Sequence, residues 1–239
     1  MKIIIIASDN HTGGGKVLIN DLLSAAIKIT SINFHILVDS RLDITEFNCK
    51  NMFFTKISKF KRIFYVNKIV GNLAKPEDVI INFSGLPFFK KYKCTKVQYL
   101  NNRFFIDDYS TLGLPIAVRL RLMLQKFAFS VYLKKTDYIF VQNLVMKDLL
   151  LKFAIDEKKI KVIPYKDIDT INFEGQILEK SFIYVASGEA HKNHLNLVKA
   201  WVKLAEDSIY PTLYLTIEKG TSLHKKILLQ THKYNLNIV

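Results

Sequence analysis

Apolar segments alternate with amphipathic segments along most of this chain. Short runs rich in Ile, Val, Leu, Phe and Tyr are followed by stretches in which apolar residues recur every three or four positions, the spacing of one helical face. The apolar runs contain few polar residues, which is typical of strands buried on both faces of a parallel sheet. Because strands that alternate with helices need crossover connections, the pattern predicts an α/β fold with a largely parallel sheet.

The first part of the chain reads as one complete Rossmann-like domain, which we assign to residues 1–165. Its strands are expected at 2–8, 33–38, 77–85, 95–100, 136–143 and 159–165, and its helices at 17–29, 116–133 and 144–155. Residues 50–75 mix short apolar runs with lysines, and the pattern assigns no element to them.

A polar, irregular stretch at residues 166–180 is interpreted as a linker, and the alternation restarts after it. Strands are expected at 181–187 and 211–217, helices at 194–207 and 222–234, and the first step of a third strand at 237–239. Doubly wound domains ordinarily have five or six strands, so residues 181–239 are expected to form an incomplete second Rossmann-like domain. Such a domain would pack on the first one or on a partner chain, or remain loosely folded.

Three consecutive glycines, Gly13, Gly14 and Gly15, lie between the first predicted strand and the first predicted helix. Ligands of open parallel sheets bind beyond the carboxyl ends of the strands, where this turn is expected. Glycine has no Cβ, so an anion can approach the N–H groups at the helix start. The spacing fits neither G-x-G-x-x-G nor a Walker loop, since Lys16 follows directly without Ser or Thr after it. The alternative is an ordinary flexible turn.

A second strand-to-helix junction lies in YVASGEAHKNHLNL, residues 184–197. Lys192 offers a point charge suited to phosphate, and Asn193 is placed to cap the helix that follows. In the alternative, Asn193 only caps and Lys192 is only solvated. His191 and His194 are three positions apart, but no cysteine or further histidine completes a metal site, so no metal is expected.

Taken together, these segments resemble the family 4 glycosyltransferases of the GT-B fold, and among them the bacterial members that build surface polysaccharides. The resemblance is carried by ASDNHTGGGKVLINDLL, VQYLNNRFFIDD, TDYIFVQNLVMKDLLLKFAIDEKKIKVIPY and FIYVASGEAHKNHLNLVKAWVKLAED. It implies two Rossmann-like domains facing across a cleft, the first for the acceptor and the second for the nucleotide sugar. It also implies a transfer that retains anomeric configuration and needs no metal or other cofactor.

The resemblance implies roles for individual residues as well. The glycine loop approaches the donor's diphosphate, and Lys192 matches the lysine of a basic pair that holds it. Ser187 stands where many relatives carry arginine, so the Ser187 hydroxyl and the N–H groups of Ser187 and Gly188 are left to contact phosphate. No catalytic residue is assigned.

The family's two-glutamate donor motif is not found in this sequence, since no glutamates within residues 176–239 have the E-x7-E spacing. We therefore expect a C-terminally truncated family member, a truncated product or half of a split enzyme, whose donor domain a partner chain would complete. Because positioning supplies much of an enzyme's rate, such a chain is expected to be weak or inactive alone.

Other polar residues are expected near the ligand edge of the first domain. Asn102 and Arg103 follow a strand, and Arg103 could pair with a phosphate of the acceptor or donor. Alternatively, Arg103 pairs with Asp107 or Asp108 and holds a loop. His11, just before the glycine turn, could bind a sugar or leaving-group oxygen, or be a turn residue only.

The net charge of +14 is unevenly distributed, because residues 50–103 hold twelve Lys and Arg against two acidic residues. Such a field attracts phosphate groups, or it is simply a solvated basic face. The basic, aromatic stretch 53–65 suits the surface of an anionic membrane, which a lipid-linked acceptor would make useful. No helix-turn-helix, zinc-finger or RNP pattern is present, so nucleic acid is not expected as a partner.

Cysteine usage and hydropathy bear on the compartment. Cys49 and Cys94 are far apart and lack metal-ligand spacing, which fits a reducing cytoplasm. The apolar run 3–7 is too short for a secretory signal, and no run of about 20 apolar residues is present. We expect a cytoplasmic protein, with peripheral contact to the inner face of the plasma membrane if it binds lipid.

Two functions remain open on these grounds. The first is a glycosyltransferase that moves a sugar from a nucleotide-sugar donor to a saccharide or lipid-linked saccharide acceptor. The second is a non-catalytic fragment that binds an acceptor, a membrane surface or a partner chain.

Overall fold

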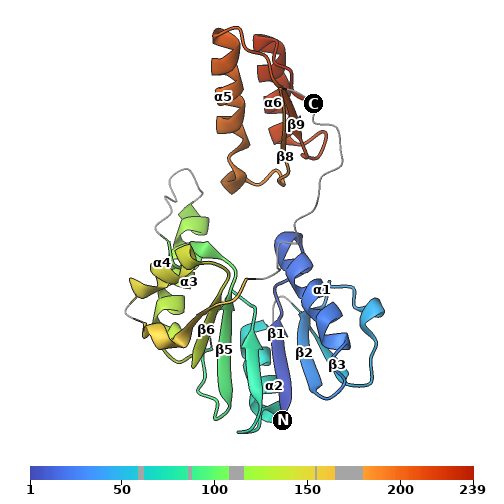
Figure 1. Ribbon diagram of the computed structural model, residues 1–239, viewed down its shortest axis with the longest axis vertical. Helices are drawn as coiled ribbons and strands as arrows, with labels where there is room; N and C mark the ends of the chain where they lie inside the picture. The colour runs from blue at the N-terminus through green and yellow to red at the C-terminus, as the bar shows by residue number, and fades with distance from the viewer. Residues whose placement is uncertain (59–61, 86–87, 108–115, 154, 165–179) are drawn as a thin grey trace. The chain divides into compact units, whose positions relative to one another are not determined.

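The computed structural model describes the chain except for residues 59–61, 86–87, 108–115, 154 and 165–179. The chain forms two compact units, Met1–Ile168 and Asp169–Val239 (Figure 1). Each unit has its own hydrophobic core. The predicted linker, 166–180, lies outside the described residues except for Lys180, which forms a turn with a φ of 54°.

The first unit is built on a seven-stranded sheet in which all neighbouring strands are parallel, in the order β3-β2-β1-β4-β5-β6-β7 (Figure 1). The strands are β1 (Lys2–Ala7), β2 (Asn33–Asp39), β3 (Met52–Ile57), β4 (Val79–Asn82), β5 (Thr95–Leu100), β6 (Tyr138–Val141) and β7 (Ile160–Val162). Central β1 pairs Ile4 with His35 of β2 on one side and with Ile80 of β4 on the other. Strand order therefore reverses at β1 and β4, where doubly wound folds bind their ligands.

Helices cover both faces of this sheet. They are α1 (Gly13–Ile27), α2 (Arg62–Leu73), α3 (Ile116–Leu133) and α4 (Leu144–Leu151), with 3₁₀ turns η1 (Thr45–Phe47), η3 (Arg103–Phe105) and η4 (Glu157–Lys159). Successive side chains of a strand point to opposite faces. Ile5 lies in one core cluster with Leu23 of α1, whereas Ile6 lies in another with Val70 of α2. Burial on both faces explains why β1 is an unbroken run of isoleucines.

Residues 50–75, to which the sequence pattern assigned no element, contain β3 and α2. β3 is an edge strand, and its Lys56 is exposed to solvent. α2 is a surface helix whose Lys68 is likewise exposed. Because an edge strand and a surface helix each keep one face in water, polar residues interrupt their apolar pattern and hide it.

The second unit is a small parallel sheet with two helices. Its elements are β8 (Ser181–Tyr184), η5 (Ala190–Lys192), α5 (His194–Glu206), β9 (Thr212–Leu215) and α6 (Ser222–Tyr234). Ile238 forms a parallel bridge with Leu213 of β9, and the N–H of Val239 donates to the Leu213 carbonyl at 2.8 Å. The structure therefore confirms the first step of a third strand at 237–239, beside β9.

Trp201 of α5 is the only tryptophan of the chain and belongs to the core of the second unit. Its indole N–H donates to the carbonyl of Pro211 at 2.9 Å, and its ring meets Phe182 edge-on at 5.5 Å between centroids. Trp201 fluorescence therefore reports the packing of the second unit.

We expect Val198→Ala to destabilise the second unit by about 2 kcal/mol, because two methyl groups are removed from a side chain that is 1% exposed. The urea midpoint followed by Trp201 fluorescence should fall. Leu23→Ala in the core of the first unit is the matched control and should lower the far-ultraviolet ellipticity midpoint while leaving the fluorescence transition in place. Fluorescence and ellipticity transitions that move together in both variants would contradict two separate cores.

Candidate functional site

The three glycines form the first turn of α1, so this helix begins four residues before the predicted range 17–29. Gly13 has a φ of +55°, a conformation that favours glycine. A Cβ on Gly13 or Gly14 would meet no atom within 4 Å, and one on Gly15 would touch Asn10 at 3.6 Å. Glycine therefore leaves the main chain of this turn open.

The start of α1 carries no compensating charge of its own. Thr12, at the N-cap position, makes no side-chain hydrogen bond to the helix, and the first turn holds no acidic residue. The first N–H groups of a helix have no carbonyl partner within it, and the helix dipole places partial positive charge there. The exposed Lys16 adds a full charge to the same end, which suits an anion.

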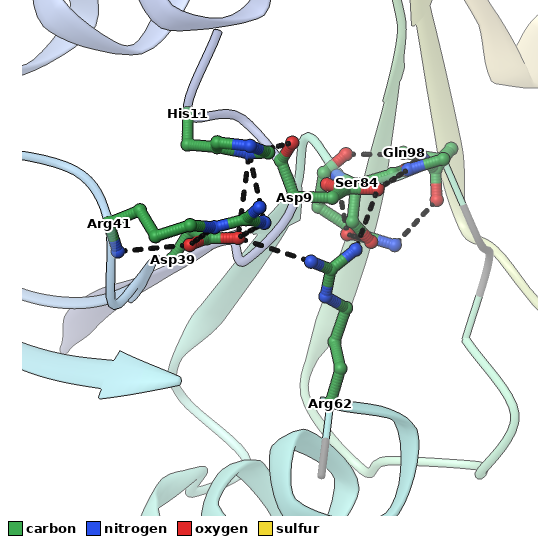
Figure 2. A network of polar contacts seen from close by, with 9 residues as sticks. Asp9, His11, Asp39, Arg41, Arg62, Ser84 and Gln98 are labelled. Atoms are coloured by element: carbon green, nitrogen blue, oxygen red, sulfur yellow. Dashed lines mark hydrogen bonds and ion pairs between the residues drawn. The ribbon is translucent and has the colours of Figure 1, made fainter. Parts of the chain in front are cut away.

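Polar side chains from four adjacent strands and the start of α2 meet at the carboxyl edge of the sheet (Figure 2). We call them the carboxyl-edge cluster, and its members are Asp9, His11, Asp39, Arg41, Arg62, Asn82, Ser84 and Gln98. The cluster lies where strand order reverses, which is the ligand-binding position of doubly wound sheets.

Asp39, at the end of β2, is the centre of this cluster and has no exposed side-chain surface. Its Oδ1 accepts from Nε of Arg41 at 2.8 Å, and its Oδ2 accepts from Nη2 of Arg41 at 2.7 Å and from Nη2 of Arg62 at 3.1 Å. Nδ1 of His11 lies 3.5 Å from Oδ2. The hydrogen bonds from Arg41 outweigh the effect of burial and lower the pKa of Asp39 to about 2.

Asp9, which follows β1, has a pKa that is shifted in the opposite direction to that of Asp39. Its Oδ2 accepts from the N–H of Gly85 at 3.0 Å and lies 3.9 Å from Nη1 of Arg62. Its Oδ1 is buried and has no hydrogen-bond partner among the described residues. Burial raises the pKa of Asp9, because desolvation disfavours the charged carboxylate. Arg62 thus lies between two carboxyl groups whose pKa values are shifted apart, an arrangement that can hold or release a proton.

Gly85 approaches two different parts of the first unit. A Cβ at this position would lie 3.0 Å from Cζ of Phe105 and 3.6 Å from Oδ2 of Asp9. The ring of Phe105 in turn stacks on Phe129 of α3 at 5.1 Å between centroids. The tight neighbour of a side chain at 85 would therefore be Phe105, whereas its contact with Asp9 would be an ordinary one.

Within the cluster, two amide side chains hold β4 and β5 together. Nδ2 of Asn82 donates to Oε1 of Gln98 at 2.8 Å, and Nε2 of Gln98 donates to the carbonyl of Ser84 at 3.1 Å. A cavity of about 40 Å³ lies beside them, and Asn82, Ser84, Asp9 and Arg62 are among its lining residues. This volume holds a few water molecules and is too small for a sugar ring.

Arg103, in η3 after β5, forms an ion pair with Asp107, with Nε 2.6 Å from Oδ2. This pairing is the alternative that the sequence left open, in which Arg103 holds a loop. Arg103 is nevertheless half exposed, and the neighbouring Asn102 is exposed.

The junction after β8 departs from the sequence prediction at Asn193. This residue occupies the N-cap position of α5, but its side chain makes no capping hydrogen bond, so the predicted side-chain cap is wrong. Its backbone is left-handed, with φ 58° and ψ 33°, a conformation that asparagine tolerates better than most residues. The Asn193 carbonyl accepts from the N–H groups of Asn196 and Leu197 at 3.1 and 3.3 Å.

Two of the three other residues predicted to contact phosphate here, Ser187 and Lys192, take part in local hydrogen bonds. Oγ of Ser187 donates to Oε2 of Glu189 at 2.9 Å. The hydroxyl of Tyr184 donates to the carbonyl of Lys192 at 2.8 Å and thereby fixes η5. Because this hydrogen bond ties the Ser187 hydroxyl to an acidic side chain, a phosphate would have to compete with Glu189 for it.

A pocket of about 360 Å³ lies at the starts of α5 and α6. Its lining residues are Gly188, Glu189, Ala190, Asn193, His194, Leu195, Ser222, Leu223 and Lys226. The volume lies in the range of small-molecule sites. Two predicted residues, Gly188 and Asn193, therefore line one pocket, whereas Ser187 and Lys192 are not among its lining residues.

His194 lines this pocket although its residue is only 2% exposed. Neither ring nitrogen has a hydrogen-bond partner within the described part of the chain. The ring meets Tyr184 edge-on at 5.1 Å between centroids. Buried polar atoms are normally paired, so these two nitrogens point to a ligand or water in the pocket.

Sequence reasoning found the positions of both junctions but missed several of the groups that surround them. The missed residues are Asp39, Arg41, Arg62 and Lys226. A charged residue at the end of the apolar run NFHILVD was a usable signal for Asp39, whereas the two arginines come from a loop and an unassigned helix. Over the described ranges, no group of three or more His, Cys, Asp or Glu is placed to hold a metal ion.

No protein-family model matches the chain, and no curated protein matches it. Solved structures do match its fold. WaaB, a lipopolysaccharide outer core galactosyltransferase in its apo form, aligns with 100% of this chain and 67% of its own, at 12% identity and a TM-score of 0.60. HepE of Anabaena, in complex with UDP and glucose, aligns with 100% of this chain and 68% of its own, at 12% identity and a TM-score of 0.59.

A third match has a different activity in its name. UDP-GlcNAc 2-epimerase from Neisseria meningitidis, bound to UDP-GlcNAc, aligns with 100% of this chain and 72% of its own, at 12% identity and a TM-score of 0.52. Sequence identities this low establish a shared architecture and no shared chemistry. The predicted α/β class is confirmed, and the architecture of this chain is the GT-B fold.

Proposed function

We propose that this protein is a glycosyltransferase that takes its sugar from a nucleotide-sugar donor and passes it, with retention of configuration, to a saccharide or lipid-linked saccharide. The GT-B fold supports this proposal, because WaaB is a galactosyltransferase of that fold and HepE was captured with UDP and glucose. The resemblance of the junction sequences to family 4 glycosyltransferases points to the same class of reaction.

The observation that carries the proposal is the pocket at the starts of α5 and α6. The side chain of Asn193 leaves the first N–H groups of α5 uncapped, so they are available to a phosphate. Lys226 supplies a positive charge on the facing side of the pocket, and His194 supplies two ring nitrogens in need of a partner. An anion with hydroxyl groups next to it, as in a sugar diphosphate, meets all three requirements.

We propose that the carboxyl-edge cluster forms the part of the substrate-binding site that the first unit contributes. The partly exposed Asp9 carboxyl group and His11 imidazole suit the hydroxyl groups of a saccharide, and the open first turn of α1 suits an anion. Asp39 keeps His11 and Arg41 in place beside that turn. We propose that no metal ion is needed, since helix N–H groups and lysines meet the phosphate charge.

A titration of the full chain with UDP-glucose tests the pocket. We expect Lys226→Gln to weaken binding roughly fivefold, as loss of one exposed charge contact does. Lys225→Gln is the matched control, because Lys225 directly precedes Lys226 on α6, is exposed and does not line the pocket. His194→Leu, of similar volume, should weaken binding without loss of stability, since it removes two buried nitrogens that have no partner.

Equal losses of UDP-glucose affinity for the Lys226 and Lys225 variants would show attraction to net charge and would contradict the pocket assignment.

Product analysis then separates the two reactions, sugar transfer and epimerisation, that are named for proteins of this fold. Release of UDP that depends on an added saccharide indicates transfer, whereas conversion of UDP-GlcNAc without any acceptor would replace the proposal by epimerisation.

Gly14→Val tests the glycine turn. A Cβ at this position meets no atom within 4 Å, so we expect unchanged stability, while the branched side chain covers the first turn of α1 and weakens UDP-glucose binding about tenfold. Gly71→Val, at an equally open position in α2, is the control and should bind like wild type. Unaltered binding by Gly14→Val would leave the turn without a ligand role.

The pH dependence of stability tests the Asp39 network. Because the folded-state pKa of Asp39 is about 2, below its unfolded value, the ionised carboxylate stabilises the fold at neutral pH, and this contribution is lost as pH falls from about 4 toward 2. We expect Asp39→Asn to cost about 2 kcal/mol of unfolding free energy at pH 7 and progressively less below pH 4. Urea denaturation followed by ellipticity measures it, with exposed Asp21→Asn on α1 as control. A cost that stays constant down to about pH 3 would rule out the paired carboxylate.

A further inference from the structure

Helix α3 presents a stripe of large apolar side chains to solvent. Six residues of this helix are exposed by between 45% and 81%, namely Ile116, Leu120, Met123, Leu124, Phe127 and Val131. Isolated apolar residues on a surface are ordinary, but a contiguous apolar patch marks a site that contacts another molecule or a membrane.

Helical geometry places these six residues on one side of α3. At 3.6 residues per turn they fall within an arc of about 100°, so they form a single continuous stripe. The opposite side of the helix carries Phe129 and Leu133, which are 0% and 1% exposed and belong to the core shared with β5, β6 and α4. The outward stripe is therefore a second apolar face, in excess of what the core needs.

The charges around the stripe identify the kind of surface that it fits. Arg119 and Arg121 lie on its two flanks by the same helical geometry. Residues 109–136 contain five Lys and Arg and no acidic residue. An apolar stripe bordered by arginines is the pattern of a helix that lies in the interface of an anionic membrane, with its apolar face among the acyl chains and its cations at the phosphates.

A second copy of this chain fits the face less well. Pairing of two α3 helices would bring Arg119 and Arg121 toward their own counterparts with no acidic residue on the helix to pair with them, and like charges in contact oppose association. No helix within the described parts of the chain is long and apolar enough to cross a bilayer. A contact through α3 is therefore interfacial.

The basic stretch 53–65, which the sequence suggested for the same purpose, places the exposed aromatic residues of its described part in two different elements. Phe53 lies near the amino end of β3, beside His35, whereas Phe64 lies in the first turn of α2, which follows the carboxyl end of β3. A six-residue strand spans roughly 20 Å, so these exposed aromatic rings are not neighbours. Residues 59–61 of the stretch lie outside the described residues.

We propose that the outward face of α3, the stripe from Ile116 to Val131 with Arg119 and Arg121 beside it, binds the surface of a membrane that carries anionic headgroups. The surface is lipid rather than protein, and the helix lies parallel to it. This contact is independent of the donor pocket, because it needs neither a nucleotide nor a saccharide.

Flotation of the full chain with vesicles tests the proposal. We compare vesicles of phosphatidylcholine alone with vesicles that contain phosphatidylglycerol, each at low and high salt. The wild-type chain should float with the anionic vesicles and lose most of that binding at high salt. The double variant Leu120→Ser, Phe127→Ser should retain its melting temperature, since both residues are exposed, and bind at least about tenfold less. Phe64→Ser, at an 87% exposed ring on α2, is the matched control and should float like wild type.

Several results would overturn the proposal. They are no flotation of the wild-type chain with anionic vesicles, equal flotation with phosphatidylcholine alone, and flotation that the α3 double variant leaves unchanged. Light scattering on the same samples provides the last test. A wild-type dimer that the double variant dissociates, without any vesicle binding, would assign the stripe to a second copy of the chain.

Discussion

A negative charge without exposed surface organises the carboxyl edge of the first unit. A buried carboxylate is tolerated only when cations and hydrogen bonds compensate for its lost hydration. Asp39 therefore requires Arg41 from its own loop, Arg62 from α2 and His11 from the segment before α1 to converge on one point. Three connections that are separate in the sequence are fixed in this way next to the open first turn of α1.

The degree of burial of each element explains which parts of the structure could be predicted from the sequence. β1 was predictable because burial on both faces demands an unbroken apolar run. β3 and α2 were not predictable, because each has a solvent-exposed face whose polar residues interrupt the apolar pattern. The junctions were found because polar residues follow apolar strands. The charge pairs that join these junctions to residues distant in sequence could not be predicted. Arg62 of α2, for example, lies 23 positions from Asp39.

Asn193 shows a different limit of sequence reasoning. An asparagine before a helix is ordinarily a side-chain cap. Here it adopts a left-handed backbone, which directs its carbonyl rather than its side chain to the helix. No residue pattern distinguishes these two uses of asparagine, yet the difference decides whether the N–H groups of α5 are occupied or open to a ligand.

The position of Gly85 has a consequence for how this protein can vary. The backbone N–H of residue 85 bonds to Asp9 of the polar cluster, while the absence of a side chain leaves room for the ring of Phe105 in the apolar core. A side chain at 85 would press on the ring at 105, which would have to move aside, and a smaller residue at 105 would leave a void beside Phe129. Positions 85 and 105 are therefore expected to change together in evolution. A replacement at one position should be tolerated when a compensating replacement occurs at the other.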